Sequence, residues 1–177
     1  MKNVINCFAF TFCLVSLAGC GPDGQAIDQF GQEKIALSVS TEGDVRIVYG
    51  QPSMVWEEEQ GARTLEFVKG PAGHRTFMIQ MGADGKVKAV NQVLKPEFFI
   101  KVMQGMSQDQ VRRLIGAPGS KTPFSLAKEE MWQWRWLDNA ESKFFQVHFD
   151  KKSDSPTLGL VSKVTMAPDL EGSASAR

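Results

Sequence analysis

The chain has 177 residues, and its 20 lysines and arginines balance its 20 aspartates and glutamates, which gives a formal net charge of +0 at pH 7. This balance excludes the strong basic excess that recruits nucleic acid or an anionic membrane face. Apolar side chains make up 42% of the chain, and the length suffices for one ordinary domain or two very small ones.

The first 19 residues have the pattern of an export signal. Lys2 precedes a mostly apolar stretch over residues 4–17, which is too short for a membrane-spanning helix and suits the apolar region of a signal peptide. The stretch leads into a Leu-Ala-Gly-Cys tetrapeptide that ends at Cys20 and resembles the lipobox of bacterial lipoproteins. We therefore predict a signal peptide over residues 1–19 and lipidation of Cys20. The alternative is an ordinary secretory signal with a chance cysteine.

The cysteine pattern supports lipidation. Cys7 and Cys13 lie in the segment that would be removed, so Cys20 is the only cysteine of the mature chain. A lone cysteine cannot form an intramolecular disulfide, whereas several acyl chains on it would hold the protein stably on a membrane. Gly21 stands where an aspartate would favour retention in the inner membrane. We therefore predict a palmitate-bearing lipoprotein of the outer membrane that faces the periplasm.

One motif occurs twice in the chain. Val45, Arg46, Gly50 and Pro52 recur 66 residues later as Val111, Arg112, Gly116 and Pro118. A fixed-period echo indicates that one small structural unit was copied. We predict five segments: the signal peptide (1–19), a polar tether (20–34), a first repeat (35–94), a second repeat (95–166) and a disordered tail (167–177).

The second repeat predicts two helices and three strands. Pro96 suits the first position of a helix that Gly105 ends in the left-handed conformation. Ser107 and Gln110 form a capping box for a second helix, which Gly116 ends in the same left-handed way. Period-two alternation then predicts a meander of strands through residues 132–136, 145–149 and 158–166.

The first repeat has the same order, with Thr41 and Asp44 as its capping pair. Val39 and Ser40 occupy the positions of Gly105 and Met106, so we expect its opening helix to be short, frayed or missing. The predicted fold class is α+β, with two tandem helix-helix-three-stranded antiparallel sheet repeats and the helices on one face of the sheet. Two copies side by side could form one long sheet.

The stretch from Gly105 and Met106 through Val111, Gly116 and Pro118 resembles the BamE (SmpA/OmlA) family of outer-membrane lipoproteins. The resemblance implies two helices on a three-stranded sheet and a non-enzymatic role in outer-membrane protein assembly or envelope integrity, through protein contacts that include barrel-assembly components. The tandem arrangement is similar to the β-lactamase inhibitor protein fold, which implies the alternative of a periplasmic binding or inhibitory module for an enzyme.

The sequence contains no convincing catalytic or metal-binding set. We interpret His74 as a loop residue and His148 as a sheet-surface or half-buried residue. A zinc site requires more histidine or cysteine ligands than the mature chain offers. The acidic runs at 57–59 and 129–130 read as solvated loop faces. We therefore predict a protein that is not an enzyme, has no catalytic residue, metal or cofactor, and binds neither nucleic acid nor a small-molecule substrate.

The four tryptophans are the strongest candidates for contact with a partner protein. Trp132, Trp134 and Trp136 share one face of a predicted strand. They are either core beneath the helices or an exposed binding strip, and their match with Leu65 and Phe67 favours the core. Trp56 lacks a predicted strand partner, so we name it as the candidate partner-binding residue.

Overall fold

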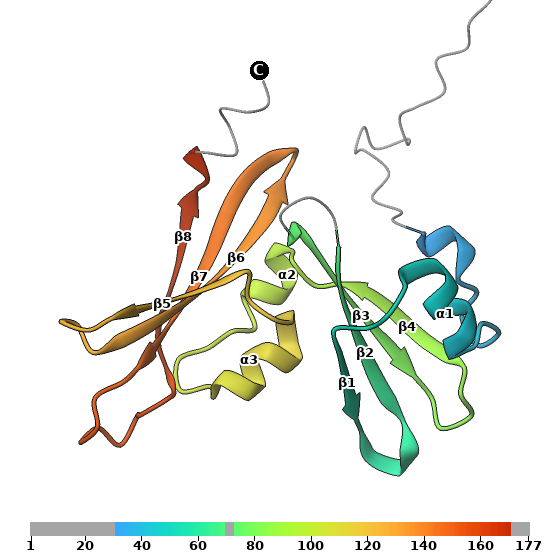
Figure 1. Cartoon of the computed structure of the whole chain (residues 1–177), viewed down its shortest axis with the longest axis horizontal. Coiled ribbons are helices and arrows are strands. Elements are labelled where there is room, and N and C mark those ends of the chain that lie inside the picture. Colours follow the sequence, from blue (N-terminus) through green and yellow to red (C-terminus); the bar gives the residue numbers. More distant parts are fainter. Residues whose placement is uncertain (1–30, 70–72, 171–177) are drawn as a thin grey trace, which may run out of the picture.

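The computed structural model describes residues 31–69 and 73–170 and contains two four-stranded antiparallel sheets with few helices (Figure 1). The predicted α+β class is confirmed. The signal peptide, Cys20, most of the tether and residues 171–177 of the tail lie outside the described residues. Within the described ranges, no helix has both the length and the apolar character needed to cross a membrane.

The first half builds its sheet in the order β1-β2-β3-β4, and one helix covers one face. Val45 and Tyr49 of the helix are buried against a cluster that includes Leu65, Phe77 and Ile79. In chain order the elements are η1 (Gln32–Lys34), α1 (Glu42–Tyr49), β1 (Met54–Glu57), η2 (Glu59–Gly61), β2 (Arg63–Lys69), β3 (Arg75–Met81) and β4 (Val87–Gln92).

The second half repeats this plan, with sheet order β5-β6-β7-β8. Its elements are α2 (Pro96–Phe99), α3 (Gln108–Ile115), β5 (Ser120–Phe124), β6 (Glu129–Asp138), β7 (Glu141–Asp150) and β8 (Val161–Pro168). Trp132, Trp134 and Trp136 are at most 4% exposed and pack with Val111 and Ile115 of α3. The three indoles are therefore core, as the pattern favoured.

The two halves share several local details. Thr41 and Ser107 both cap their helices through complete capping boxes, with Asp44 and Gln110 as the reciprocal partners. Both cap residues also form isolated bridges to the last hairpin, Thr41 with Lys86 and Ser107 with Leu160. Each sheet has an irregular register at the same place, after Gln80 in one and after His148 in the other. These matches support the duplication inferred from the sequence.

Several predictions about the elements were wrong. Each sheet has four strands, because the segments at β1 and β5 also pair. In the first half, by contrast, the opening helix was expected to be short or missing, and among the described residues only the 3-10 turn η1 precedes α1. The helix at Pro96 is one turn long, because Lys101 and Val102 bond back three residues and tighten the chain. The last strand continues to Pro168, two residues into the predicted tail.

Gly116 ends α3 as predicted, but not in the left-handed helical conformation. Its φ is 83° and its ψ is −174°, and Gly50 at the end of α1 has φ 76° and ψ −149°. This region of positive φ and extended ψ is open almost only to glycine. It turns the chain sharply away from the helix axis toward the first strand of each sheet.

The two sheets do not join into one long sheet. Helices α2 and α3 lie between them, so that α1, the first sheet, the α2–α3 pair and the second sheet form successive layers (Figure 1). One side of α3 packs on the second sheet through Val111 and Ile115. Its other side faces the back of the first sheet, where Ala117 just beyond the helix donates a hydrogen bond to Glu66.

A groove between the two halves as the candidate site

The back face of the first sheet is the surface on which the candidate site is built. Its strand register aligns side chains in two rows across the sheet. One row runs Trp56, Thr64, Gln80 and Ala89, and the other runs Met54, Glu66, Met78 and Asn91. The second row lies beneath α3 at Glu66 and Met78, which are 0% and 4% exposed. The first row extends beyond the helix.

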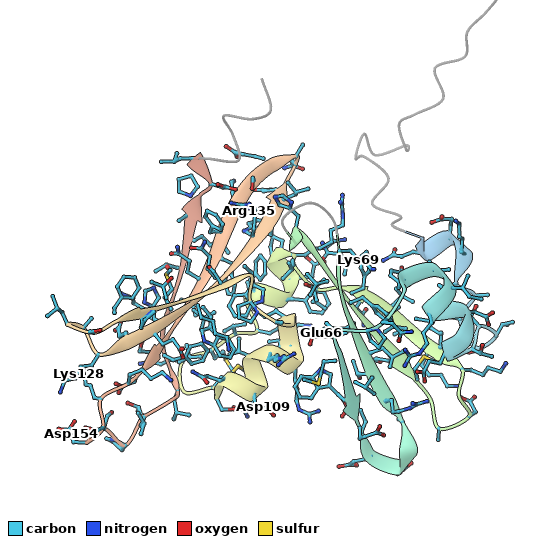
Figure 2. All side chains as sticks on the ribbon, viewed as in Figure 1. Glu66, Lys69, Asp109, Lys128, Arg135 and Asp154 are labelled. Atoms are coloured by element: carbon cyan, nitrogen blue, oxygen red, sulfur yellow. The ribbon has the colours of Figure 1, made fainter. Side chains whose placement is uncertain are left out.

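Glu66 ties the two halves together. Its side chain points from β2 toward α3 (Figure 2), where Oε1 accepts hydrogen bonds from Ser53 Oγ at 3.1 Å and from Ala117 N at 3.0 Å. Its Oε2 lies 3.6 Å from Arg112 Nε, which is an ion-pair contact rather than a hydrogen bond. A fully buried carboxylate needs such partners to offset its desolvation.

Trp56 lies at this interface and not on a free surface. The absence of a strand partner was a wrong prediction, because Trp56 of β1 pairs with Thr64 of β2. The Arg113 guanidinium lies over its ring at 4.5 Å, and Arg113 also reaches Glu58 at 3.4 Å. The indole is half-buried, and its Nε1 has no hydrogen-bond partner in the described part of the chain. Its role as a contact for a partner stays a prediction.

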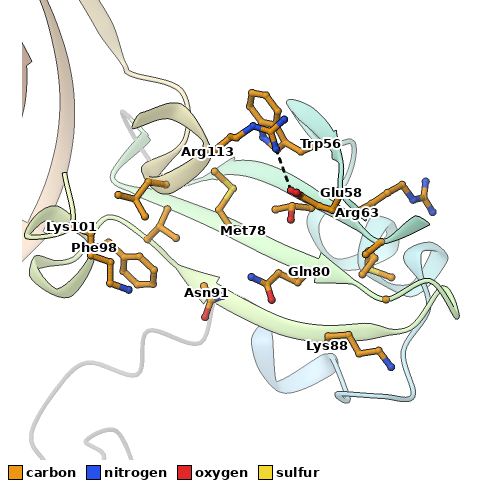
Figure 3. Close-up of a pocket in the computed structure, with 16 residues that line it drawn as sticks. Trp56, Glu58, Arg63, Met78, Gln80, Lys88, Asn91, Phe98, Lys101 and Arg113 are labelled. Atoms are coloured by element: carbon orange, nitrogen blue, oxygen red, sulfur yellow. Dashed lines mark hydrogen bonds and ion pairs between the residues drawn. The ribbon is translucent and has the colours of Figure 1, made fainter. Parts of the chain in front are cut away.

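Beside Trp56 the two halves leave an open groove with a volume of about 690 Å³, shown in Figure 3. Ligand sites commonly have volumes of this order. The first half supplies the floor and one wall, and α2 and α3 supply the opposite wall. The lining side chains used below are Trp56, Glu58, Arg63, Thr64, Gln80, Lys88, Asn91, Phe98, Lys101 and Arg113.

The floor of the groove has hydrogen-bonding groups without partners. The side chains of Thr64, Gln80 and Asn91 make no hydrogen bond to the described residues, and Figure 3 shows Gln80 and Asn91 rising from β3 and β4 into the groove. Each amide offers two donors and one acceptor. Phe98 of α2 and Trp56 of β1 both line the groove, so each half contributes one aromatic ring.

The groove is lined by more cations than anions. Arg63, Lys88, Lys101 and Arg113 line it, against the single carboxylate of Glu58. The Lys101 ammonium lies 4.7 Å from the centre of the Phe98 ring and has no carboxylate partner among the described residues. The other three cations are held in ion pairs, which leaves Lys101 as the exception.

A second polar cluster joins the halves near the N-terminal end of β7. His74 Nε2 lies 3.2 Å from Ser142 Oγ, which donates to Asp169 Oδ2 at 2.6 Å. Asp169 also pairs with Arg135 at 2.7 Å. Acyl transfer by a serine needs the hydroxyl to be directed at the imidazole, whereas here it is directed at a carboxylate that already pairs with Arg135. We therefore interpret the cluster as a structural contact between the two halves.

His148 lies on the outer face of the second sheet, as its strand phase predicted. Its Nδ1 is 3.1 Å from Glu129 Oε2, and Phe124 stacks on its ring at 6.3 Å. Burial and the positive charge of Lys163 lower the pKa of His148, and Glu129 opposes this shift. Among residues 31–69 and 73–170, no group of three or more His, Cys, Asp and Glu side chains could hold a metal ion.

Sequence reasoning missed most of the groove. Of its lining, only Trp56 was named as a candidate. Gln80, Asn91 and Lys101 follow no motif or spacing in the sequence that would mark them as residues of a site. They become a site only because α2 and α3 pack against the back of the first sheet.

Comparisons with known proteins leave the family open. No family model matches the chain, and no curated protein matches it. One similar solved structure is the DUF4309 family protein YjgB from Bacillus subtilis, with 13% identity over 76% of this chain and 82% of that chain and a TM-score of 0.29. Another, a "putative beta-lactamase inhibitor protein" from Streptococcus mutans, has 16% identity over 80% and 94% and a TM-score of 0.29. Likenesses this weak carry no argument about family or function.

Proposed function

We propose that this protein is a non-enzymatic lipoprotein, anchored in the outer membrane through a lipid on Cys20, that contributes to outer-membrane protein assembly or envelope integrity by binding another protein. The groove between the halves supports this proposal. It is lined from both halves, has one aromatic ring from each half, and has a floor of amides that are free to bond to a ligand. These are the properties of a recognition surface.

The absence of enzymatic activity is part of the proposal. The one described cluster that joins a histidine, a serine and an aspartate directs the serine hydroxyl at Asp169. The groove contains Glu58 as its only carboxylate and no histidine, so it offers no pair of groups for acid–base work. Binding therefore accounts for the groove better than catalysis does.

A crosslinking pull-down from intact cells tests the proposal, with the wild type compared to Cys20→Ala. We expect barrel-assembly proteins to be captured by the wild type and lost in Cys20→Ala, because the lipid places the groove beside them. A soluble hydrolase captured equally by both forms would favour the alternative of a periplasmic inhibitory module. Capture of neither class of protein by the wild type would contradict both.

A further inference from the structure

We propose that the groove binds an extended, acidic segment of the partner protein. The inference rests on the proposed function and names the chemistry of the segment that this site recognises. Two properties of the groove support it: the excess of cations in its lining and the free amides on its floor.

The charge of the lining favours an anionic occupant. The lining contains four cationic side chains and a single carboxylate. The acids that pair with Arg63, Lys88 and Arg113 from outside are Glu42, Asp84 and Asp109, none of which lines the groove. These acids hold the cations in place without entering the site, and a partly enclosed surface of one sign attracts the opposite charge.

The existing ion pairs leave the cations available. Lys88 and Asp84 are 44% and 55% exposed, and Arg113 and Glu58 are 42% and 41% exposed. Exposed pairs of this kind contribute only about 0 to 1 kcal/mol. Each guanidinium also has five donors, so Arg63 and Arg113 can accept a further carboxylate. Lys101 has no carboxylate partner among the described residues, so no ion pair must break before it binds an anion.

The floor of the groove favours an extended peptide. An α-helix bonds its main-chain N–H and C=O groups internally, so a helical segment would leave the amides of the floor without main-chain partners. An extended segment instead presents main-chain N–H and C=O groups along its length. Gln80 and Asn91, on adjacent strands of the floor, carry both donors and acceptors to meet them.

Selection from a random octapeptide library displayed on phage tests the inference with the intact protein as bait. We expect the selected peptides to be enriched in Asp and Glu over the input library. The best of them should bind Lys101→Glu about tenfold more weakly than the wild type. Gln80→Ala should weaken binding by about three- to tenfold, as the loss of one hydrogen bond does.

Lys34→Glu is the matched control. It makes the same change in charge at an exposed lysine of η1, outside the groove lining. Binding equal to the wild type in Lys34→Glu, with the loss confined to Lys101→Glu, would support the inference. Equal losses in both variants would overturn it, since a general charge effect would then explain the binding. Melting of each variant shows whether it is folded.

Three other outcomes also test whether the groove binds an acidic peptide. Selected peptides without acidic enrichment would overturn the inference, whether or not the pull-down captures a partner. Binding to phosphatidylglycerol vesicles that is weakened by Lys101→Glu, without acidic enrichment among peptides, would assign the groove to an anionic headgroup instead. Acidic enrichment with no partner captured in cells would leave the inference standing and contradict the proposed envelope role.

Discussion

At the residue scale, Gly116 is under two separate constraints. Its backbone conformation is one that side chains avoid, and a Cβ atom there would lie 2.5 Å from Thr76 Cγ2 on the first sheet. Gly50 has a matching conformation at the end of α1, but a Cβ there would meet only the Lys69 Nζ atom at 3.9 Å. Substitutions at the two glycines can therefore distinguish the cost of backbone strain from the cost of a steric clash between the halves.

Substitution of each glycine by alanine should show both effects. We expect Gly50→Ala to destabilise the protein by about 1–3 kcal/mol through backbone strain. Gly116→Ala should cost about 1–3 kcal/mol more, because the new methyl group overpacks the interface at Thr76. Urea unfolding measures both free energies. Equal losses in the two variants would show that the contact with Thr76 relaxes freely.

Asp150 gives the protein a predictable response to acid. Hydrogen bonds from Ser155 and Thr157, with one from the Lys152 amide, lower its pKa from 3.8 to about 2. A lowered pKa means that the folded state binds fewer protons than the unfolded state. Its contribution to stability is therefore complete above about pH 4 and declines as the pH falls toward 2.

Asp150→Asn tests this response, because it removes the ionisable group and keeps the shape. We expect the variant to be less stable than the wild type at pH 6 and the difference to shrink between pH 4 and pH 2. Chemical unfolding at a series of pH values measures it. A difference that stays constant across this range would mean that the hydrogen bonds do not depend on the charge of Asp150.

At the element scale, Glu66 decides how firmly α3 is held against the first sheet. The carboxylate is fully buried, whereas Arg112 is 29% exposed and so keeps part of its hydration. Glu66→Gln retains an oxygen that can accept from Ser53 and Ala117, and Glu66→Ala retains neither bond. We expect a loss of about 1–2 kcal/mol for glutamine and about 3–5 kcal/mol for alanine, by urea unfolding.

Arg113→Gln serves as the control for this pair, since its ion pairs with Glu58 and Asp109 are exposed. It should cost no more than about 2 kcal/mol, which covers these ion pairs and the contact of the guanidinium with the Trp56 ring. A loss in Glu66→Ala as small as that in Arg113→Gln would show that the buried tie does not hold the halves together.

The elements differ in how well the sequence predicted them. Helix α3 was predicted because Ser107 and Gln110 mark its start and Gly116 its end. Strand β5 was missed because all five of its residues are exposed and Pro123 interrupts it, as is common in an edge strand. Strand β1 is four residues long and has no buried residue, so alternation gave no signal.

At the scale of the whole molecule, the layers end in a polar face. The back of the first sheet is covered by α3, whereas the matching face of the second sheet is crossed by a ladder of polar bonds. Gln146 donates to Gln133 at 2.8 Å and accepts from Thr165 at 3.0 Å. Gln133 stands where the strand match puts Glu66 in the first half. A polar outer face is typical of the last unit in a repeat stack.

The candidate site could not be predicted from either half alone. Duplication, capping and core positions depend on local pattern, so the sequence revealed them. The groove depends on which face of the first sheet meets α2 and α3, and that choice follows from contacts of Glu66, Thr76 and Gly116 that span 40 or more residues of chain. These contacts have no periodic signature.

The most direct test of the central claim, that a partner docks in the groove, is photo-crosslinking in intact cells from two single positions. A photoreactive residue at Gln80 lies on the groove floor, and one at Thr165 lies on the outer face of the second sheet. We predict that one identified envelope protein crosslinks from Gln80 and not from Thr165, and that Lys101→Glu reduces the yield. Crosslinking from Thr165 with none from Gln80 would contradict the account.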